Sequence, residues 1–147
     1  MSRGLGDVYK RQVYSLICND MTSALETVGL DPYVGFMHTL RPGRASLALD
    51  VMEELRAYLG DRLILSLINR KQITIKDFVK QGDESIVMTD SGRKTILTAW
   101  QSRKKETITH PYLNEKVSIG LLPYIQSMLL ARFIRKDIDD YPVFLIQ

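Results

Sequence analysis

Apolar residues recur at intervals of three and four along most of the chain, and this spacing predicts amphipathic helices. The first run covers about residues 12–28, and Gly29 supplies a helix stop after it. Residues 33–44 contain glycine and proline and are predicted to form a loop. A second, longer run covers about residues 46–70. Gly60 lies inside that run and predicts a break or a kink.

The second half of the chain repeats the helical pattern after one interruption. Residues 74–89 predict either a small hairpin or a helical turn followed by a strand. Thr89 is a suitable cap for a third helix that extends to about Thr107, and a fourth helix is expected at about residues 121–137. The apolar tail, residues 141–147, is expected to pack back on the helices. In the third helix the side chains of Ile96, Leu97 and Trp100 are predicted to face inward. The fourth helix is predicted to carry four apolar side chains on one face: Ile125, Leu129, Phe133 and Ile134.

Composition is that of one ordinary globular domain, with 147 residues, 45% hydrophobic and 25% charged. No apolar stretch approaches the roughly 20 residues that cross a bilayer, so a membrane-spanning protein is not predicted. The start of the chain lacks the features of a secretory signal, so a cytoplasmic location is expected. The net charge of +3 is compatible with a polyanionic partner but does not identify one.

Three carboxylates share one side of the predicted second helix: Asp50, Glu53 and Glu54, at positions i, i+3 and i+4. One interpretation is a solvated acidic face. However, Val51, Met52 and Leu55 near Glu53 are apolar, which predicts that this carboxylate is enclosed and needs a partner. The sequence therefore leaves open both a surface cluster and a cation site on this helix.

A histidine precedes that helix. His38 lies in an apolar part of the loop, where it is either a structural residue or a metal ligand. Paired with Glu53 it would suit Mn²⁺ or Mg²⁺, and the absence of a cysteine cluster argues against structural zinc. Arg41, Arg44 and Arg56 could hold phosphates beside such a metal or form plain ion pairs. The second histidine, His110, has no evident carboxylate companion and is interpreted as structural.

Three stretches of the chain form a recognisable series: Gly29-Leu-Asp-Pro, Gly35-Phe-Met-His38 and Leu49-Asp-Val-Met-Glu-Glu54. In this order and at this spacing they closely resemble the family of CRISPR-associated protein one (Cas1), the spacer integrases. The resemblance covers nearly all of residues 13–147, whereas residues 1–12 do not resemble the family. It implies a mainly α fold: the helical, catalytic carboxy-terminal domain with a small hairpin insertion, and with the amino-terminal β-rich domain missing.

The resemblance also implies a set of site residues. His38 and Glu53 match two metal ligands of the family, and Asp50 matches an acidic position beside the site. The implied cofactor is Mg²⁺ or Mn²⁺. The third ligand would be a glutamate of an upstream helix, and residues 1–12 contain no glutamate. DNA contacts would fall to Arg41, Arg44 and Arg56.

The implied activity is that of a metal-dependent DNA endonuclease and integrase of CRISPR adaptation. In such a reaction a DNA 3′ hydroxyl attacks a phosphodiester at the edge of a CRISPR repeat, and a new spacer is joined by transesterification. The implied partners are double-stranded DNA, CRISPR-associated protein two (Cas2) and a second copy of the protein, with no membrane. Without the missing ligand, this chain is expected to be inactive alone. The alternative is a non-catalytic helical DNA-binding or assembly module.

Overall fold

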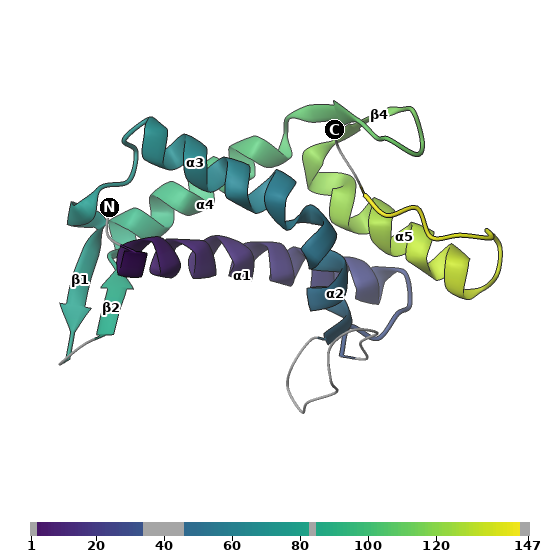
Figure 1. The fold of residues 1–147 in the computed structure, drawn as a ribbon, viewed down its shortest axis with the longest axis horizontal. Coiled ribbons are helices and arrows are strands. Elements are labelled where there is room, and N and C mark those ends of the chain that lie inside the picture. Colours follow the sequence, from purple (N-terminus) through teal and green to yellow (C-terminus); the bar gives the residue numbers. More distant parts are fainter. Residues whose placement is uncertain (1–2, 34–45, 83–84, 145–147) are drawn as a thin grey trace.

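The chain is mainly helical, as the sequence predicts, and carries two small antiparallel hairpins within its described residues (Figure 1). The computed structural model describes residues 3–33, 46–82 and 85–144. In chain order the elements are α1 (Arg3–Thr27), α2 (Ser46–Leu55), the π-helical turn η1 (Arg56–Asp61), α3 (Arg62–Asn69), the 3₁₀ turn η2 (Ile75–Asp77), β1 (Phe78–Gln81), β2 (Ser85–Met88), α4 (Asp90–Lys104), β3 (Thr107–Thr109), β4 (Lys116–Ser118), the 3₁₀ turn η3 (Ile119–Leu121) and α5 (Leu122–Ile134).

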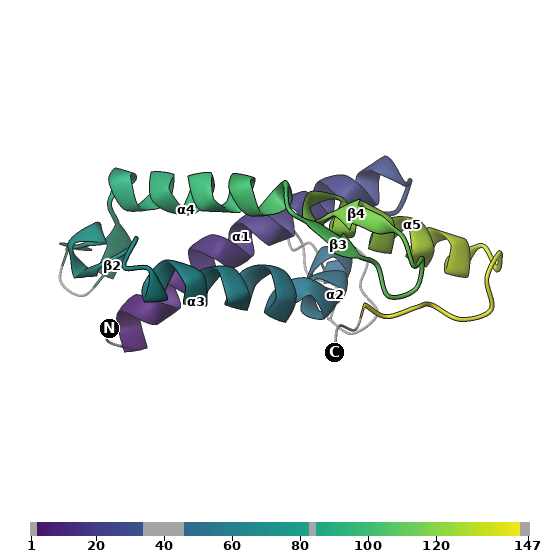
Figure 2. The same cartoon turned by 90° about the horizontal axis from the view of Figure 1, so that it is seen from above.

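Helix α1 is the central element, and α2, α3 and α5 all contact it. Figures 1 and 2 show it passing between the other helices along most of the length of the molecule. Its fully buried residues follow one another every four positions: Tyr9, Val13, Ile17, Met21 and Leu25. Because this spacing keeps side chains on one helix face, α1 presents a continuous apolar stripe to the core.

The predicted start of this helix, at about Gln12, is wrong, since α1 begins at Arg3. The residue that extends it is Tyr9, which is completely buried and packs its ring 5.8 Å from that of Phe78. Two glycines in the first turns interrupt the apolar pattern, so the sequence did not predict that the helix starts this early. Tertiary packing therefore overrides the weak local propensity of these turns.

The hairpin predicted between residues 74 and 89 is confirmed, because β1 pairs antiparallel with β2 and Phe78 lies opposite Met88. The second hairpin, in which β3 pairs with β4, was not predicted. Its strands have three residues each, too short for the alternation of apolar and polar positions that reveals a strand. None of the helices among the described residues is long and apolar enough to cross a membrane.

The predicted interruption at Gly60 is also confirmed, because this residue lies in the π-helical turn between α2 and α3. Gly60 is buried, and a Cβ atom there would lie 3.0 Å from Cδ1 of Ile17 and 3.0 Å from Cε1 of Tyr14. The hydroxyl of Tyr14 donates a 2.6 Å hydrogen bond to Asp61. The lack of a side chain at Gly60 thus lets α1 pack closely against the turn.

Replacing Gly60 with valine is expected to destabilise the fold by about 1 to 3 kcal/mol, the usual cost of forcing extra atoms into a packed core. The matched control is Ala57→Val, because Ala57 is exposed in the same turn and receives the same branched side chain. Urea denaturation of both variants measures the difference. Equal losses of stability would contradict the close packing of α1 on Gly60.

Helix α4 starts as predicted, with the Thr89 hydroxyl accepting a 3.0 Å hydrogen bond from the amide of Gly92. Ile96 and Trp100 are buried, but the prediction that Leu97 faces inward is wrong, since Leu97 is 46% exposed. The reason is that α4 buries one narrow stripe, at positions four residues apart, and leaves its other sides in solvent.

Helix α5 and the segment after it fit the predictions in part. Of the four apolar residues predicted to share one face, Ile125 and Leu129 are buried, whereas Phe133 and Ile134 are exposed in the last turn of α5, beyond the point where the core ends. The chain then turns and runs back along α5 (Figure 1), and Phe144 is buried in the core. The predicted packing of the tail is therefore confirmed as far as residue 144.

Candidate functional site

The acidic face of α2 lies at the surface around Glu53. The Glu53 side chain is 50% exposed and forms a 3.4 Å ion pair with Arg56, one turn further along. The prediction that Glu53 is enclosed is wrong, because its apolar neighbours Val51, Met52 and Leu55 point to the other side of the helix and are themselves buried. Asp50, one turn earlier, is largely buried.

The enclosed carboxylate of this helix is instead Glu54. The Tyr141 hydroxyl donates to both of its oxygens, at 2.8 and 2.7 Å. The amide of Phe144 and the side-chain amide of Gln126 donate to Oε1, at 3.0 and 3.2 Å. Burial raises the pKa of Glu54, and these hydrogen bonds oppose that rise. Burial, together with the nearby charge of Glu54, raises the pKa of Tyr141.

Gln126 connects this carboxylate to His110, and both residues are buried. The Nδ1 atom of His110 accepts hydrogen bonds from the amides of Tyr112 and Leu113, so the ring proton is on Nε2. Nε2 therefore donates to Oε1 of Gln126, 2.8 Å away. This contact leaves the Gln126 NH₂ group to donate to Glu54, Tyr141 and the carbonyl of Pro142. The structural interpretation of His110 is thus confirmed.

Three of the predicted site residues, His38, Arg41 and Arg44, lie outside the described residues. Among the residues that the structure does describe, no three histidine, cysteine or acidic side chains gather closely enough to hold a metal ion. What α2 offers is Asp50 and the half-exposed Glu53 one turn apart. Carboxylate oxygens are the donor type that Mg²⁺ and Mn²⁺ prefer, so Glu53, the described one of the two predicted ligands, fits such an ion, with Asp50 as the predicted acidic neighbour.

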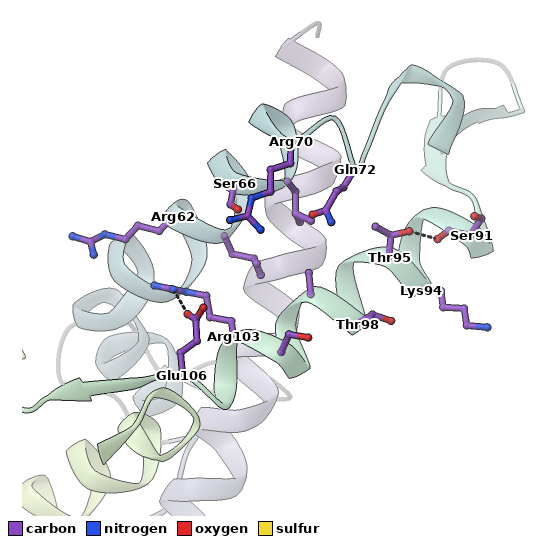
Figure 3. Close-up of a pocket in the computed structure, with 14 residues that line it drawn as sticks. Arg62, Ser66, Arg70, Gln72, Ser91, Lys94, Thr95, Thr98, Arg103 and Glu106 are labelled. Carbon is purple, nitrogen blue, oxygen red and sulfur yellow. Dashed lines mark hydrogen bonds and ion pairs between the residues drawn. The ribbon is translucent and has the colours of Figure 1, made fainter. Parts of the chain in front are cut away.

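A second candidate region is a groove of about 620 Å³ between α3 and α4 (Figure 3). Four cationic side chains line it, against one carboxylate, that of Glu106. The cationic residues are Arg62, Arg70, Lys94 and Arg103. The other polar lining residues are Ser66, Gln72, Ser91, Thr95, Thr98 and Ser102. This combination of cations with small hydroxyl and amide groups is suited to contacts with a phosphate backbone.

Two of these arginines are held in place by Tyr58. The guanidinium groups of Arg62 and Arg103 lie 4.5 and 5.2 Å from the centre of the Tyr58 ring. Arg103 also donates to the Tyr58 carbonyl at 3.1 Å and pairs with Glu106 at 2.8 Å. Arg103 therefore already has partners within the protein, whereas Arg70 and Lys94 are exposed at the groove.

The sequence of this chain matches a known protein family. A family described as CRISPR associated protein Cas1 matches residues 12–102, more than half of the chain. The chain belongs to the Cas1 family. The resemblance seen in the sequence is thereby confirmed.

Similar Cas1 proteins are found in several bacteria. "CRISPR-associated endonuclease Cas1 1" of Chlorobaculum tepidum is 58% identical over 90% of this chain, and "CRISPR-associated endonuclease Cas1 2" of Rhodospirillum rubrum is 55% identical over 88%. In both cases the alignment covers 38% of the relative. This Cas1 chain thus spans about two fifths of the length of these relatives.

Solved structures agree with the fold. The Cas1 protein of Thermotoga maritima superposes with a TM-score of 0.79 at 29% identity, over 88% of this chain and 39% of that one. A casposase bound to integration product gives a TM-score of 0.84 at 22% identity, over 92% of this chain and 39% of that one, and this likeness concerns the fold alone.

Sequence reasoning on this Cas1 chain missed the basic groove and the role of Glu54. Lys94 and Arg103 belong to α4, whereas Arg70 directly follows α3. Nothing in the local sequence shows that α3 and α4 face each other. The partners of Glu54 lie 72 to 90 positions away along the chain, so no local signal points to them.

Proposed function

We propose that this chain is the catalytic, carboxy-terminal part of a DNA endonuclease and integrase of CRISPR adaptation. In this proposal the enzyme joins new spacers to the array by transesterification. The observation that carries it is family membership together with the accessible Glu53 and neighbouring Asp50 on α2, the two carboxylates that the sequence resemblance assigns to the site. The names of the endonuclease relatives and the fold shared with a casposase also support it.

In this proposal a divalent cation, Mg²⁺ or Mn²⁺, is held by His38 and Glu53, with Asp50 close by. When bound, such a cation supplies electrostatic stabilisation of the charge that develops on the reacting phosphoryl group. The half-exposed carboxylate of Glu53 is accessible to a ligand, and it pairs with Arg56 at 3.4 Å. The third ligand in this proposal is the upstream glutamate that the sequence resemblance implies.

The proposed partners are double-stranded DNA, a second copy of the protein and CRISPR-associated protein two. The basic groove between α3 and α4 supports the first of these, because its exposed cations suit phosphates. Two solved structures with the same fold are a Cas6-RT-Cas1–Cas2 complex and a partial form of such a complex, which supports the last. Binding through phosphates is expected to weaken with salt, at a slope of about −0.9 in log–log form for each phosphate neutralised.

Mn²⁺ titration followed by electron paramagnetic resonance tests the metal site. Glu53→Ala is expected to weaken Mn²⁺ binding by at least about 10- to 100-fold, the loss typical even for groups that only support a ligand. Glu26→Ala serves as the matched control, because Glu26 is an exposed helical carboxylate on α1.

Two outcomes would redirect the proposal. If Glu53→Ala and the unmodified chain bind Mn²⁺ equally, the metal site is wrong, and a non-catalytic DNA-binding or assembly module becomes the better description. If DNA binding does not weaken as salt rises, phosphate contacts do not carry it, and the groove is excluded as the DNA-binding surface.

A further inference from the structure

Within the described residues, the carboxy-terminal segment forms hydrogen bonds to α2 through the side chain of Glu54. Tyr141 and Phe144 of this segment supply three of the four hydrogen bonds that Glu54 accepts within the described residues. The Phe144 ring lies between Tyr58 and His110, with ring centres 5.9 and 5.6 Å away. The segment therefore reaches α2 by directional polar contacts and secures them with a buried aromatic ring.

The same carboxylate is also tied to two other elements. Gln126 of α5 donates to Glu54 and accepts from His110, which immediately follows β3. Gln126 donates as well to the carbonyl of Pro142 in the carboxy-terminal segment. Glu54 is thus the point at which α2, α5, the second hairpin and the carboxy-terminal segment are joined. We call Glu54, Gln126, Tyr141 and Phe144 the latch.

The position of Glu54 on α2 connects the latch to the carboxylates of Asp50 and Glu53. Glu54 directly follows Glu53 and lies one turn after Asp50 on the same side of the helix. A contact that fixes the rotation of α2 at Glu54 therefore also fixes the directions of the other two carboxylates. Immediately afterwards the backbone enters the π-helical turn η1, where the regular α-helical bonding pattern ends. The rotation of α2 is therefore not simply inherited from α3.

A carboxylate is a costly choice for this enclosed position. Removing a charge from water is strongly unfavourable, and a well-packed apolar side chain is often more stable in its place. What the carboxylate adds is direction: its hydrogen bonds are satisfied in only one orientation of the helix relative to the carboxy-terminal segment. The geometry therefore indicates that Glu54 sets the orientation of α2 rather than only adding to the stability of the fold.

We propose that Glu54 is a positioning residue, which the carboxy-terminal segment uses through the latch to set the orientation of Asp50 and Glu53. The proposal rests on the proposed function, because it concerns the carboxylates assigned there to the metal site. Glu54 itself touches neither metal nor DNA in this scheme. It acts through the helix that it shares with Glu53.

The test is Tyr141→Phe, which removes one hydroxyl and leaves the ring. The variant is expected to bind Mn²⁺ about 10-fold more weakly, at the lower end of the effect of groups that orient metal ligands. The control is Tyr112→Phe, since Tyr112 is an exposed tyrosine. Glu54→Gln is a second variant with the same expected direction. Affinities are measured at a temperature at which circular dichroism shows every variant fully folded, so that lost stability alone does not change them.

Two readouts separate the possible failures. If the unmodified chain binds Mn²⁺ more tightly than Glu53→Ala does, but Tyr141→Phe matches the unmodified chain, the positioning role is wrong and the proposed function stands. If Glu53→Ala has no effect, the proposed function fails. The latch is then judged by hydrogen exchange of the amides of residues 50–55. Faster exchange in Tyr141→Phe than in Tyr112→Phe supports the latch, and equal exchange overturns it.

Discussion

Replacing Gln126 with leucine is expected to lower the free energy of unfolding by about 2 to 5 kcal/mol, because each buried polar group left without a partner costs about 1 to 3 kcal/mol. Leucine is similar in size to glutamine but neither accepts from His110 nor donates to the Pro142 carbonyl. Glu54 and Tyr141 would each lose one further contact. The loss of stability therefore comes from buried polar groups that no longer have hydrogen-bond partners, and not from a cavity.

Urea denaturation followed by the fluorescence of Trp100 measures this effect, since Trp100 is the only tryptophan and is buried. The control is Gln101→Leu, an identical change at an exposed position of α4. The control is expected to shift stability by less than about 0.5 kcal/mol, as surface substitutions usually do. Similar unfolding midpoints for the two variants would show that the contacts of Gln126 contribute little to stability.

The parts of this fold that could be predicted from the sequence are those with local signals. Thr89 caps α4 through a group three residues away, and Gly60 interrupts a helical pattern on either side of it. Apolar periodicity found the helices for the same reason. The start of α1 was missed because Tyr9 is buried by a distant hairpin, through Phe78, rather than by anything in its own segment.

The candidate site depends less on local signals. Glu53 and Glu54 are adjacent and chemically equivalent, and the sequence pointed to Glu53 as the enclosed one. Which of them is enclosed depends on the rotation of α2 and on a segment about 90 residues later. The basic groove likewise exists only because α3 and α4 face each other across it. Family resemblance supplied the predicted roles of Asp50 and Glu53, since no residue pattern fixes them.

Replacing Trp100 with alanine is expected to cost about 3 to 5 kcal/mol, the usual loss for removing a large aromatic side chain from a core. Trp100 is 2% exposed, and the Lys104 ammonium group lies 5.7 Å from its ring centre and pairs with Asp20 of α1 at 3.2 Å. The variant thus loses core packing where α4 meets α1.

The control for this change is Leu97→Ala on the same helix, expected to cost less than about 0.5 kcal/mol because Leu97 is exposed. Circular dichroism in urea is the measurement, since the change at Trp100 removes the fluorescent probe. A Leu97→Ala variant as destabilised as Trp100→Ala would mean that the face of α4 predicted from the sequence is buried after all. Because Leu97 borders the residues that line the basic groove, the same result would also require a different shape for that groove.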